Sequence, residues 1–327
     1  FNRRGVEHFS LPVNSKNPFF IFQNIKKIKN IIIKNNINLV HVRSRAPAWS
    51  TYYASKKICK SISTFHNVYG HQNSIKKFYN KGLSKMDHII AISQYVKDSI
   101  SSIYNIKKKE ISVIHRGTDT ELFNPEVTDE NKFINFFSKY DLLEKKKIIL
   151  YPGRLTNWKG QIEFLEILKK INLTDFYCYF IGDDKNSSYK LKLEKAIYKN
   201  KLNQNCKILG HLPKDDLKLM YKSANLVVSA PLIPEGFGRI VSETLAMKKI
   251  ILCYNFGGSK EQILGLDDLY AVEPGNQIQM AKKIETVLDL SKVKIDQLGK
   301  IAREHVEKKF SKKTMLKKYY NYYKKLV

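Results

Sequence analysis

Two glutamates eight positions apart follow a short apolar run and bracket a glycine-rich turn. They are Glu235 and Glu243, and Gly236 and Gly238 lie between them, where an apolar pattern with helical spacing begins. A helix start flanked by glycine offers free backbone N–H groups and the positive end of the helix dipole, which together favour an anion. A carboxylate two turns along that helix repels phosphate and suits hydroxyls such as a ribose diol. The alternative is a helix-start carboxylate followed by a solvated surface charge, and both interpretations stay open.

Basic residues follow a second apolar run. Gly153 and Arg154 come directly after it, and Lys159 and Gly160 precede the next helical pattern. Arginine presents a planar fork of donors and lysine a point charge, and both suit a diphosphate. Solvated loop charges are the alternative, because the chain has 58 Lys and Arg residues.

Two further strand ends carry polar side chains. His41, Arg43 and Arg45 alternate just past one apolar run, and His66 follows another. A lone histidine is more often packed than catalytic, but its position at the end of a strand makes the two interpretations about equal. The pair Asp183–Asp184 has no third ligand in view, so we interpret it as a turn and expect no metal site.

Short apolar runs alternate with longer helical patterns, in two series separated by the polar stretch Glu126–Lys147. This alternation predicts parallel sheets built from βαβ units and an α/β fold with two Rossmann-like domains. Because ligands bind at the carboxyl ends of such strands, the residues singled out above stand where function is expected. The predicted strands are Asn38–Arg43, Ser61–Phe65, Asp87–Ile92 and Glu110–His115, then Ile148–Pro152, Phe176–Ile181, Cys206–Leu209, Leu226–Ser229 and Ile250–Cys253.

The composition suits a globular protein with 43% hydrophobic residues and a net charge of +28. This charge favours acidic partners, although an AT-rich genome also explains the abundance of Lys, Ile and Asn. The sequence lacks the motifs of nucleic-acid-binding modules, so nucleic acid is an unlikely partner. It also lacks a long apolar run and paired cysteine spacing, which predicts a protein of a reducing cytoplasm.

Taken together, these motifs resemble the family-four retaining glycosyltransferases of group 1, bacterial ones in particular, which share the GT-B fold. In that fold two Rossmann-like domains face each other across a cleft, and a C-terminal helix crosses back to the first domain. The resemblance implies an acceptor-side domain over residues 1–140, joined by helix 312–327, and a nucleotide-sugar-binding domain over residues 145–311. The matching stretches are His41–Trp49, Thr64–Asn67, Asp87–Ser93, Val113–Asp119, Pro152–Gly160, Gly210–Pro213 and Glu235–Glu243.

The resemblance also assigns roles to individual residues. Arg154 and Lys159 would hold the donor diphosphate, Glu235 the transferred sugar and Glu243 the ribose, with His66 near the anomeric carbon. Basic residues and a helix N-terminus would stabilise the leaving group without a metal or other cofactor. The implied catalytic residues are His66, Arg154, Lys159 and Glu235. The implied donor-binding residues are Gly153, Leu212, Gly236, Phe237, Gly238 and Glu243. The implied acceptor-side residues are His41, Arg43 and Arg45.

The expected function is sugar transfer from a nucleotide-sugar to a glycan or lipid-linked acceptor, by analogy in envelope polysaccharide or lipopolysaccharide synthesis. The enzyme would work in the cytoplasm or at the inner face of the membrane. For the Lys/Tyr-rich end we favour a packed crossing helix over peripheral contact with an anionic membrane. The alternatives are another GT-B activity, such as a nucleotide-sugar epimerase or a phosphorylase, and a basic protein that binds phosphate or nucleic acid.

The start of the sequence carries an expectation of its own. The segment from Phe1 has the pattern of a loop, and the helical pattern Pro18–Lys34 directly precedes the strand with His41. The glycine-rich loop that the resembled enzymes usually carry after their first strand does not occur here. We therefore expect a truncated first domain that lacks at least one βα unit.

Overall fold

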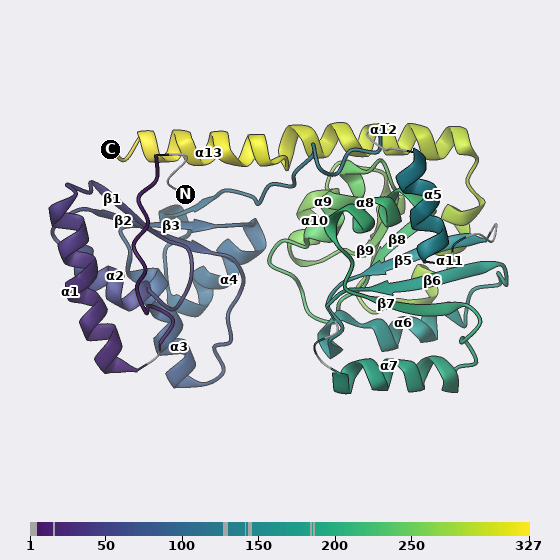
Figure 1. Cartoon of the computed structure of the whole chain (residues 1–327), viewed down its shortest axis with the longest axis horizontal. Coiled ribbons are helices and arrows are strands. Elements are labelled where there is room, and N and C mark those ends of the chain that lie inside the picture. Colours follow the sequence, from purple (N-terminus) through teal and green to yellow (C-terminus); the bar gives the residue numbers. More distant parts are fainter. Residues whose placement is uncertain are drawn as a thin grey trace. The chain divides into compact units, whose positions relative to one another are not determined.

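The computed structural model describes residues 5–15, 17–126, 130–140, 142, 146–183, 185 and 187–327. The chain divides into two compact units (Figure 1). Unit 1 comprises Phe1–His115 with Lys317–Val327, and unit 2 comprises Arg116–Leu316. Each unit is an α/β structure around a parallel sheet, which confirms the predicted fold class. The expected boundary near residue 140 differs from this division, because residues 116–140 belong to unit 2.

Unit 1 contains a four-stranded parallel sheet whose strands lie side by side in chain order. The sequence predicted all four strands, and side-chain caps begin the helices Ser74–Lys81 and Gln94–Tyr104 between them. Ser93, for example, begins the helix after the third strand by accepting a hydrogen bond from the Val96 amide. The strands are β1 (Leu39–Val42), β2 (Lys60–Phe65), β3 (His88–Ala91) and β4 (Ile111–Val113). The helices are α1 (Pro18–Lys34), α2 (Ala48–Ser55), α3 (Ser74–Lys81) and α4 (Gln94–Tyr104), with short 3-10 turns η2 (Gly82–Lys85) and η3 (Lys108–Glu110).

The C-terminal segment completes unit 1. Helix α13 (Lys312–Lys324) begins in unit 2, and its residues from Lys317 onward belong to unit 1, as expected for a crossing helix. Tyr319 is buried there, and its hydroxyl lies 3.4 Å from the hydroxyl of Thr64 on β2. The Lys60 ammonium donates a hydrogen bond to the Leu326 carbonyl. Tyr319 therefore packs inward and Tyr323 contacts His41 of β1, whereas Tyr320 is exposed.

Unit 2 contains a six-stranded parallel sheet in the order β10-β9-β8-β5-β6-β7. From β5 the chain builds outward on one side to β7, then returns to β8 and builds outward on the other side. The strand order therefore reverses between β5 and β8, the point at which ligands bind in sheets of this topology. The strands are β5 (Lys147–Pro152), β6 (Phe176–Ile181), β7 (Cys206–Gly210), β8 (Leu226–Ser229), β9 (Ile251–Tyr254) and the unpredicted β10 (Ala271–Val272).

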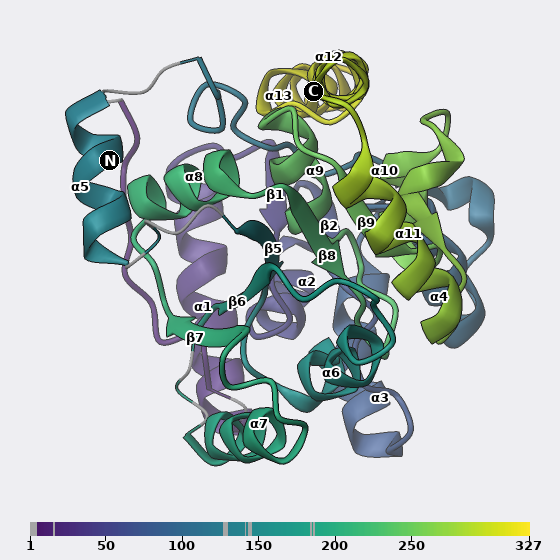
Figure 2. The ribbon, with the colours of Figure 1, turned by 90° about the vertical axis from the view of Figure 1, so that its right-hand side faces the viewer.

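Helices cover both faces of the unit 2 sheet, with α6 and α7 on one side and α8 and α9 on the other (Figures 1 and 2). Every residue of β6, β8 and β9 is buried, as expected for parallel strands enclosed between two layers of helices. The helices are α6 (Gln161–Leu168), α7 (Ser187–Lys199), α8 (Lys214–Ser223), α9 (Arg239–Ala246), α10 (Gly257–Ile263), α11 (Gln277–Asp289) and α12 (Lys292–Lys309), with 3-10 turns η4 (Asn157–Lys159) and η5 (Asp268–Tyr270).

The polar stretch predicted as a linker contains a helix, α5 (Glu130–Lys139). The Lys139 ammonium and the Tyr140 hydroxyl each lie 2.7 Å from the Asp216 carboxylate of α8, so the segment is bound to unit 2. Four of its ten residues are apolar and have helical spacing, and this short pattern was missed because polar and charged residues flank it on both sides. The rest of that stretch, 127–129, 141 and 143–145, lies outside the described residues, as do residues 1–4 of the predicted N-terminal loop and Asp184.

None of the helices within the described ranges has the length and apolar character needed to cross a membrane.

Candidate functional site

The loop after β5 is held in a fixed shape. Gly160 adopts φ = 77°, and a Cβ atom there would lie 2.5 Å from the Ala230 carbonyl oxygen after β8, so only glycine fits. The Tyr151 hydroxyl donates to the Lys159 carbonyl at 2.6 Å, and the buried Gln161 amide donates to the Arg154 carbonyl at 2.9 Å. The loop with the predicted diphosphate ligands is therefore fixed against the end of β8, at the reversal of strand order.

The loop after β8 is equally constrained. The Gln262 side-chain amide on α10 donates to the Phe237 and Gly238 carbonyls. The Gly258 amide donates to the Glu235 carbonyl at 2.9 Å. Gly238 has φ = 79°, and a Cβ there would lie 2.7 Å from the Ser259 hydroxyl. These contacts hold Glu235 to Gly238 at the start of α9, and sequence reasoning missed the Gln262 side chain and the Gly258 amide of α10 that provide them.

Lys159 and Glu235 form an ion pair between the two loops. The Lys159 ammonium lies 2.7 Å from Glu235 Oε1, and the side chains are only 9% and 14% exposed. Glu235 Oε2 is buried and has no hydrogen-bond partner within the part of the chain that the structure describes. A buried carboxylate oxygen without a donor is costly, so this atom is suited to accept a hydrogen bond from a ligand hydroxyl.

Glu243 is half-buried rather than a solvated surface charge. The Tyr221 hydroxyl donates to its carboxylate at 3.2 Å. Burial raises the pKa of Glu243, and the nearby positive charge of Arg239 offsets part of that rise. Nothing in the sequence distinguished Tyr221 as its partner.

The other predicted donor residues of unit 2 differ in exposure. The Arg154 side chain is exposed, and its guanidinium carbon lies 6.0 Å from the centre of the Trp158 ring, with the Lys159 ammonium 4.7 Å from the same ring. Trp158 thus lies beside both cations, a contact that sequence reasoning missed. Leu212 and Phe237 are buried, so they pack under the loops, and Gly153 and Gly236 line the turns.

In unit 1, His41 is held by the protein's own hydroxyls. Its Nδ1 lies 2.6 Å from the Tyr323 hydroxyl, and its Nε2 lies 2.7 Å from the Thr64 hydroxyl. Burial, with the positive charges of Arg43 and His66 adding to it, lowers the pKa of His41 to about 4. The imidazole is therefore neutral near pH 7 and joins β1 and β2 to α13. Both ring nitrogens are engaged within unit 1, and the acceptor-side assignment of His41 stays a prediction.

The remaining predicted residues of unit 1 lie at strand ends. Arg43 and Arg45 are exposed after β1, and the Arg45 guanidinium carbon lies 4.5 Å from the centre of the Tyr69 ring. His66 is half-buried directly after β2. The charges of Arg43 and His66 both act on His41, so these residues share one end of the sheet.

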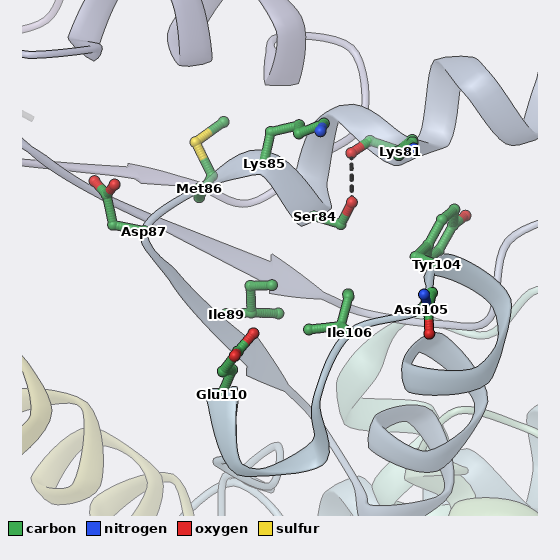
Figure 3. A pocket seen from close by; sticks show the side chains of 10 residues that line it. All are labelled: Lys81, Ser84, Lys85, Met86, Asp87, Ile89, Tyr104, Asn105, Ile106 and Glu110. Atoms are coloured by element: carbon green, nitrogen blue, oxygen red, sulfur yellow. Dashed lines mark hydrogen bonds between the residues drawn. The ribbon is translucent and has the colours of Figure 1, made fainter.

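A hollow of about 440 Å³ in unit 1 lies at the opposite, amino ends of β3 and β4 (Figure 3). Lys81, Lys85, Asp87 and Glu110 line it together with apolar side chains. The Asp87 carboxylate accepts from the Ser61 amide and hydroxyl, so it has a structural role. None of the predicted site residues lines this hollow. Within the described part of the chain, His, Cys, Asp and Glu side chains form no group of three or more that could hold a metal ion.

Comparisons with known proteins support the predicted family and fold. The family model described as glycosyl transferases group 1 matches residues 132–305, and that of glycosyltransferase family 4 matches residues 2–122. An uncharacterised glycosyltransferase of Methanocaldococcus jannaschii is 30% identical, over 87% of this chain and 73% of the relative. A glycosyltransferase structure from Rickettsia africae has a TM-score of 0.89 with 36% identity and covers 99% of this chain and 86% of its own. Anabaena HepE, solved with UDP and glucose, has a TM-score of 0.82 with 18% identity and covers 96% and 84%.

Proposed function

Because the chain belongs to the glycosyl transferases of group 1, we propose that it transfers a sugar, with retention, from a nucleotide-sugar to a glycan or lipid-linked acceptor. The observation that carries this proposal is the buried Lys159–Glu235 pair at the strand-order reversal of unit 2, where none of the described residues donates a hydrogen bond to Glu235 Oε2. A cation and an unsatisfied carboxylate oxygen in one place suit a ligand with both phosphates and hydroxyls.

The leaving diphosphate explains the basic residues. Cleavage of the glycosyl–phosphate bond develops negative charge on the diphosphate and positive charge on the sugar. The exposed Arg154 guanidinium, the Lys159 ammonium and the backbone amides after Gly236 are donors for that negative charge. One such donor aimed at the leaving oxygen is commonly worth ~2.7–4 kcal/mol. These residues stabilise the leaving group without requiring a metal, and we propose a metal-independent reaction.

The carboxylates bind the neutral parts of the donor. Glu235 Oε2 accepts a hydrogen bond from a hydroxyl of the transferred sugar, and Glu243 accepts from the ribose. The Tyr221 hydroxyl already donates to the Glu243 carboxylate and so fixes its direction. Leu212 and Phe237 support this site from below as buried side chains.

Unit 1 supplies the acceptor side in this proposal. Arg43, Arg45 and His66 at its strand ends suit an acceptor that carries phosphate, as lipid-linked glycans do, and His66 lies near the anomeric carbon. Envelope polysaccharide or lipopolysaccharide synthesis at the inner face of the membrane is the pathway we propose, with anionic lipid as a peripheral partner.

A ligand screen tests the donor part of the proposal. UDP-, GDP- and ADP-sugars are added to the chain and to its Glu243→Gln variant, and the melting temperature is measured. UDP-glucose, with which HepE has been solved in complex, is tested first. A ligand at ~100 times its Kd stabilises the folded state by about 2.7 kcal/mol. We expect the nucleotide-sugars of one base to raise the melting temperature of the parent clearly and that of the Glu243→Gln variant less. Equal melting temperatures with and without every nucleotide-sugar would contradict the proposal.

A further inference from the structure

The positive charge of the chain is concentrated in unit 1. Unit 1 has 24 Lys and Arg against 4 Asp and Glu, whereas the larger unit 2 has 34 against 26. Residues 8–86 contain 14 basic residues and no Asp or Glu. A genome-wide bias toward lysine codons would act on both units alike, so it does not explain the asymmetry. The charge of unit 1 indicates an acidic partner of that unit.

Helix α3 exposes an apolar face within this basic region. Ile75 and Phe78 are 79% and 64% exposed, and their spacing of three places them on one side of the helix. Tyr53 on α2, 52% exposed, lies beside Trp49, whose ring stacks on that of Phe78 at 5.0 Å. We call this set of five residues, Trp49, Tyr52, Tyr53, Ile75 and Phe78, the α2–α3 surface.

Lysines surround the α2–α3 surface on both helices. Lys76, Lys77 and Lys81 of α3 are exposed, and Lys56 follows α2 with its ammonium 5.7 Å from the centre of the Tyr52 ring. Helix α3 has no acidic residue. Figure 3 shows Lys81 together with Lys85 of η2 at one side of the amino-end hollow.

The apolar residues are held rigidly in their exposed positions. The Asn73 side chain accepts hydrogen bonds from the Ile75 and Lys76 amides and so fixes the start of α3. The Trp49 indole donates to the Tyr79 carbonyl at 3.1 Å. A Cβ atom on Gly82 would lie 3.0 Å from the Trp49 ring, so glycine permits this close packing. The fold therefore keeps Ile75 and Phe78 in water instead of burying them.

The α2–α3 surface is connected to the acceptor-side residues. The Asn80 amide of α3 donates to the Gly70 carbonyl, in the loop that leaves β2 after His66. The Arg45 guanidinium donates to the side-chain oxygen of Asn80 at 3.4 Å. A partner bound to α3 would therefore lie near Arg45, one of the residues proposed to receive the acceptor.

We propose that unit 1 docks on an anionic lipid membrane through the α2–α3 surface, an inference that rests on the proposed lipid-linked acceptor. Aromatic and aliphatic side chains enter the boundary between headgroups and acyl chains, and the surrounding lysines bind the acidic headgroups. Trp and Tyr are the residues that prefer this boundary. Nucleic acid does not account for the exposed Ile75, because bases stack on aromatic rings and pair with donors.

Sedimentation with lipid vesicles tests the proposal. The full chain is mixed with vesicles of phosphatidylcholine alone or with added phosphatidylglycerol. We expect binding to the mixed vesicles and a loss of roughly 10-fold or more in partitioning for the double variant Ile75→Ser, Phe78→Ser. The matched control is Leu191→Ser, Tyr198→Ser on α7 of unit 2, whose side chains are 56% and 77% exposed, and it should bind as the parent does.

Further readouts separate this inference from the proposed function. An unchanged melting temperature and unchanged stabilisation by nucleotide-sugar in the α3 variant would show that the variant is folded. Vesicle binding that is equal in the parent and the folded α3 variant would overturn the docking surface while leaving sugar transfer intact. Binding of the parent to homopolymeric RNA but not to mixed vesicles would also overturn it. Vesicle binding without any response to nucleotide-sugars would instead contradict the proposed function.

Discussion

Lys159 and Glu235 carry opposite charges in a place where neither is well hydrated, so each depends on the other. Removing one partner of such a pair leaves a charge that water cannot fully solvate, which commonly costs about 3–5 kcal/mol. Arg154 differs, because its side chain is exposed and the structure binds it only weakly to Trp158. Of the two cations proposed to hold the diphosphate, Lys159 therefore contributes to the stability of the fold and Arg154 does not.

Substitution should separate these two roles. Arg154→Ala should lower the rate of transfer by roughly 10²-fold and leave the melting temperature unchanged. Lys159→Met should lower both the rate of transfer and the melting temperature. The double variant Lys159→Met, Glu235→Gln should regain the melting temperature but not the activity. Transfer and thermal unfolding are measured side by side, with the exposed Lys170→Ala as control. Activity near that of the parent in both single variants would remove these residues from the site.

Glu243 makes a prediction about pH. Burial raises its pKa above the ordinary 4.5, so the folded state holds this proton to higher pH than the unfolded chain does. Its contribution to stability is therefore complete below pH 4.5 and is lost as the pH rises through the folded-state pKa. Glu243→Gln should therefore lose less stability as the pH rises above 4.5. Urea unfolding, measured at a series of pH values from 4.5 upward, gives the free energy of unfolding for this comparison.

The same variant should bind nucleotide less tightly, by about 10-fold or more, since hydrogen bonds to a charged acceptor are the stronger kind. Calorimetry with free nucleotide measures this, and equal affinity in parent and variant would refute the ribose assignment. The sequence indicated both glutamates from their spacing around a glycine turn. It could not indicate the burial of Glu243 or its bond to Tyr221, since those depend on how α8 packs against α9.

At the level of elements, α10 holds the loop after β8, from Glu235 to Gly238, in place through close backbone contact. A Cβ on Gly258 would lie 2.5 Å from the Phe237 Cα atom, so an added methyl group must push the loop away from α10. Gly258→Ala should weaken nucleotide binding by roughly 10-fold, because shifts of about 1 Å in a site are costly. Gly70→Ala is the control, since the nearest atom to a Cβ there is 4.0 Å away. Unchanged nucleotide affinity in Gly258→Ala would contradict the role of α10.

The predicted strands and helices were found where the apolar pattern was regular. Helix Pro18–Lys34 has the predicted bounds, because its pattern is long and Asn17 caps it. Helix α5 and strand β10 were missed, since the short apolar pattern of the helix lies within a polar stretch and the strand is two residues long. Both depend on contacts with distant parts of unit 2 that no local pattern records. The Lys159–Glu235 pair likewise joins residues 76 positions apart.

At the level of the whole molecule, unit 1 needs residues 317–327 to cover its sheet. Tyr323→Ala with Tyr319→Ala removes the partners of His41 and Thr64 and should lower the unfolding temperature of unit 1. Unit 2 should keep its nucleotide affinity, because these residues belong to unit 1. Scanning calorimetry with and without nucleotide separates the two transitions, and the exposed Tyr320→Ala serves as control. A shift of the nucleotide-sensitive transition alone would contradict this division.

The segment that completes unit 1 is also synthesised after the whole of unit 2. Domains generally fold as units while the ribosome makes them, the first one first. Here the first unit to be translated waits with His41 and Thr64 uncovered until Tyr319 and Tyr323 have left the exit tunnel. Unit 2 has all of its described strands by Val272 and ends at Leu316, three positions before Tyr319. The unit whose synthesis begins first is therefore the last to receive all of its residues.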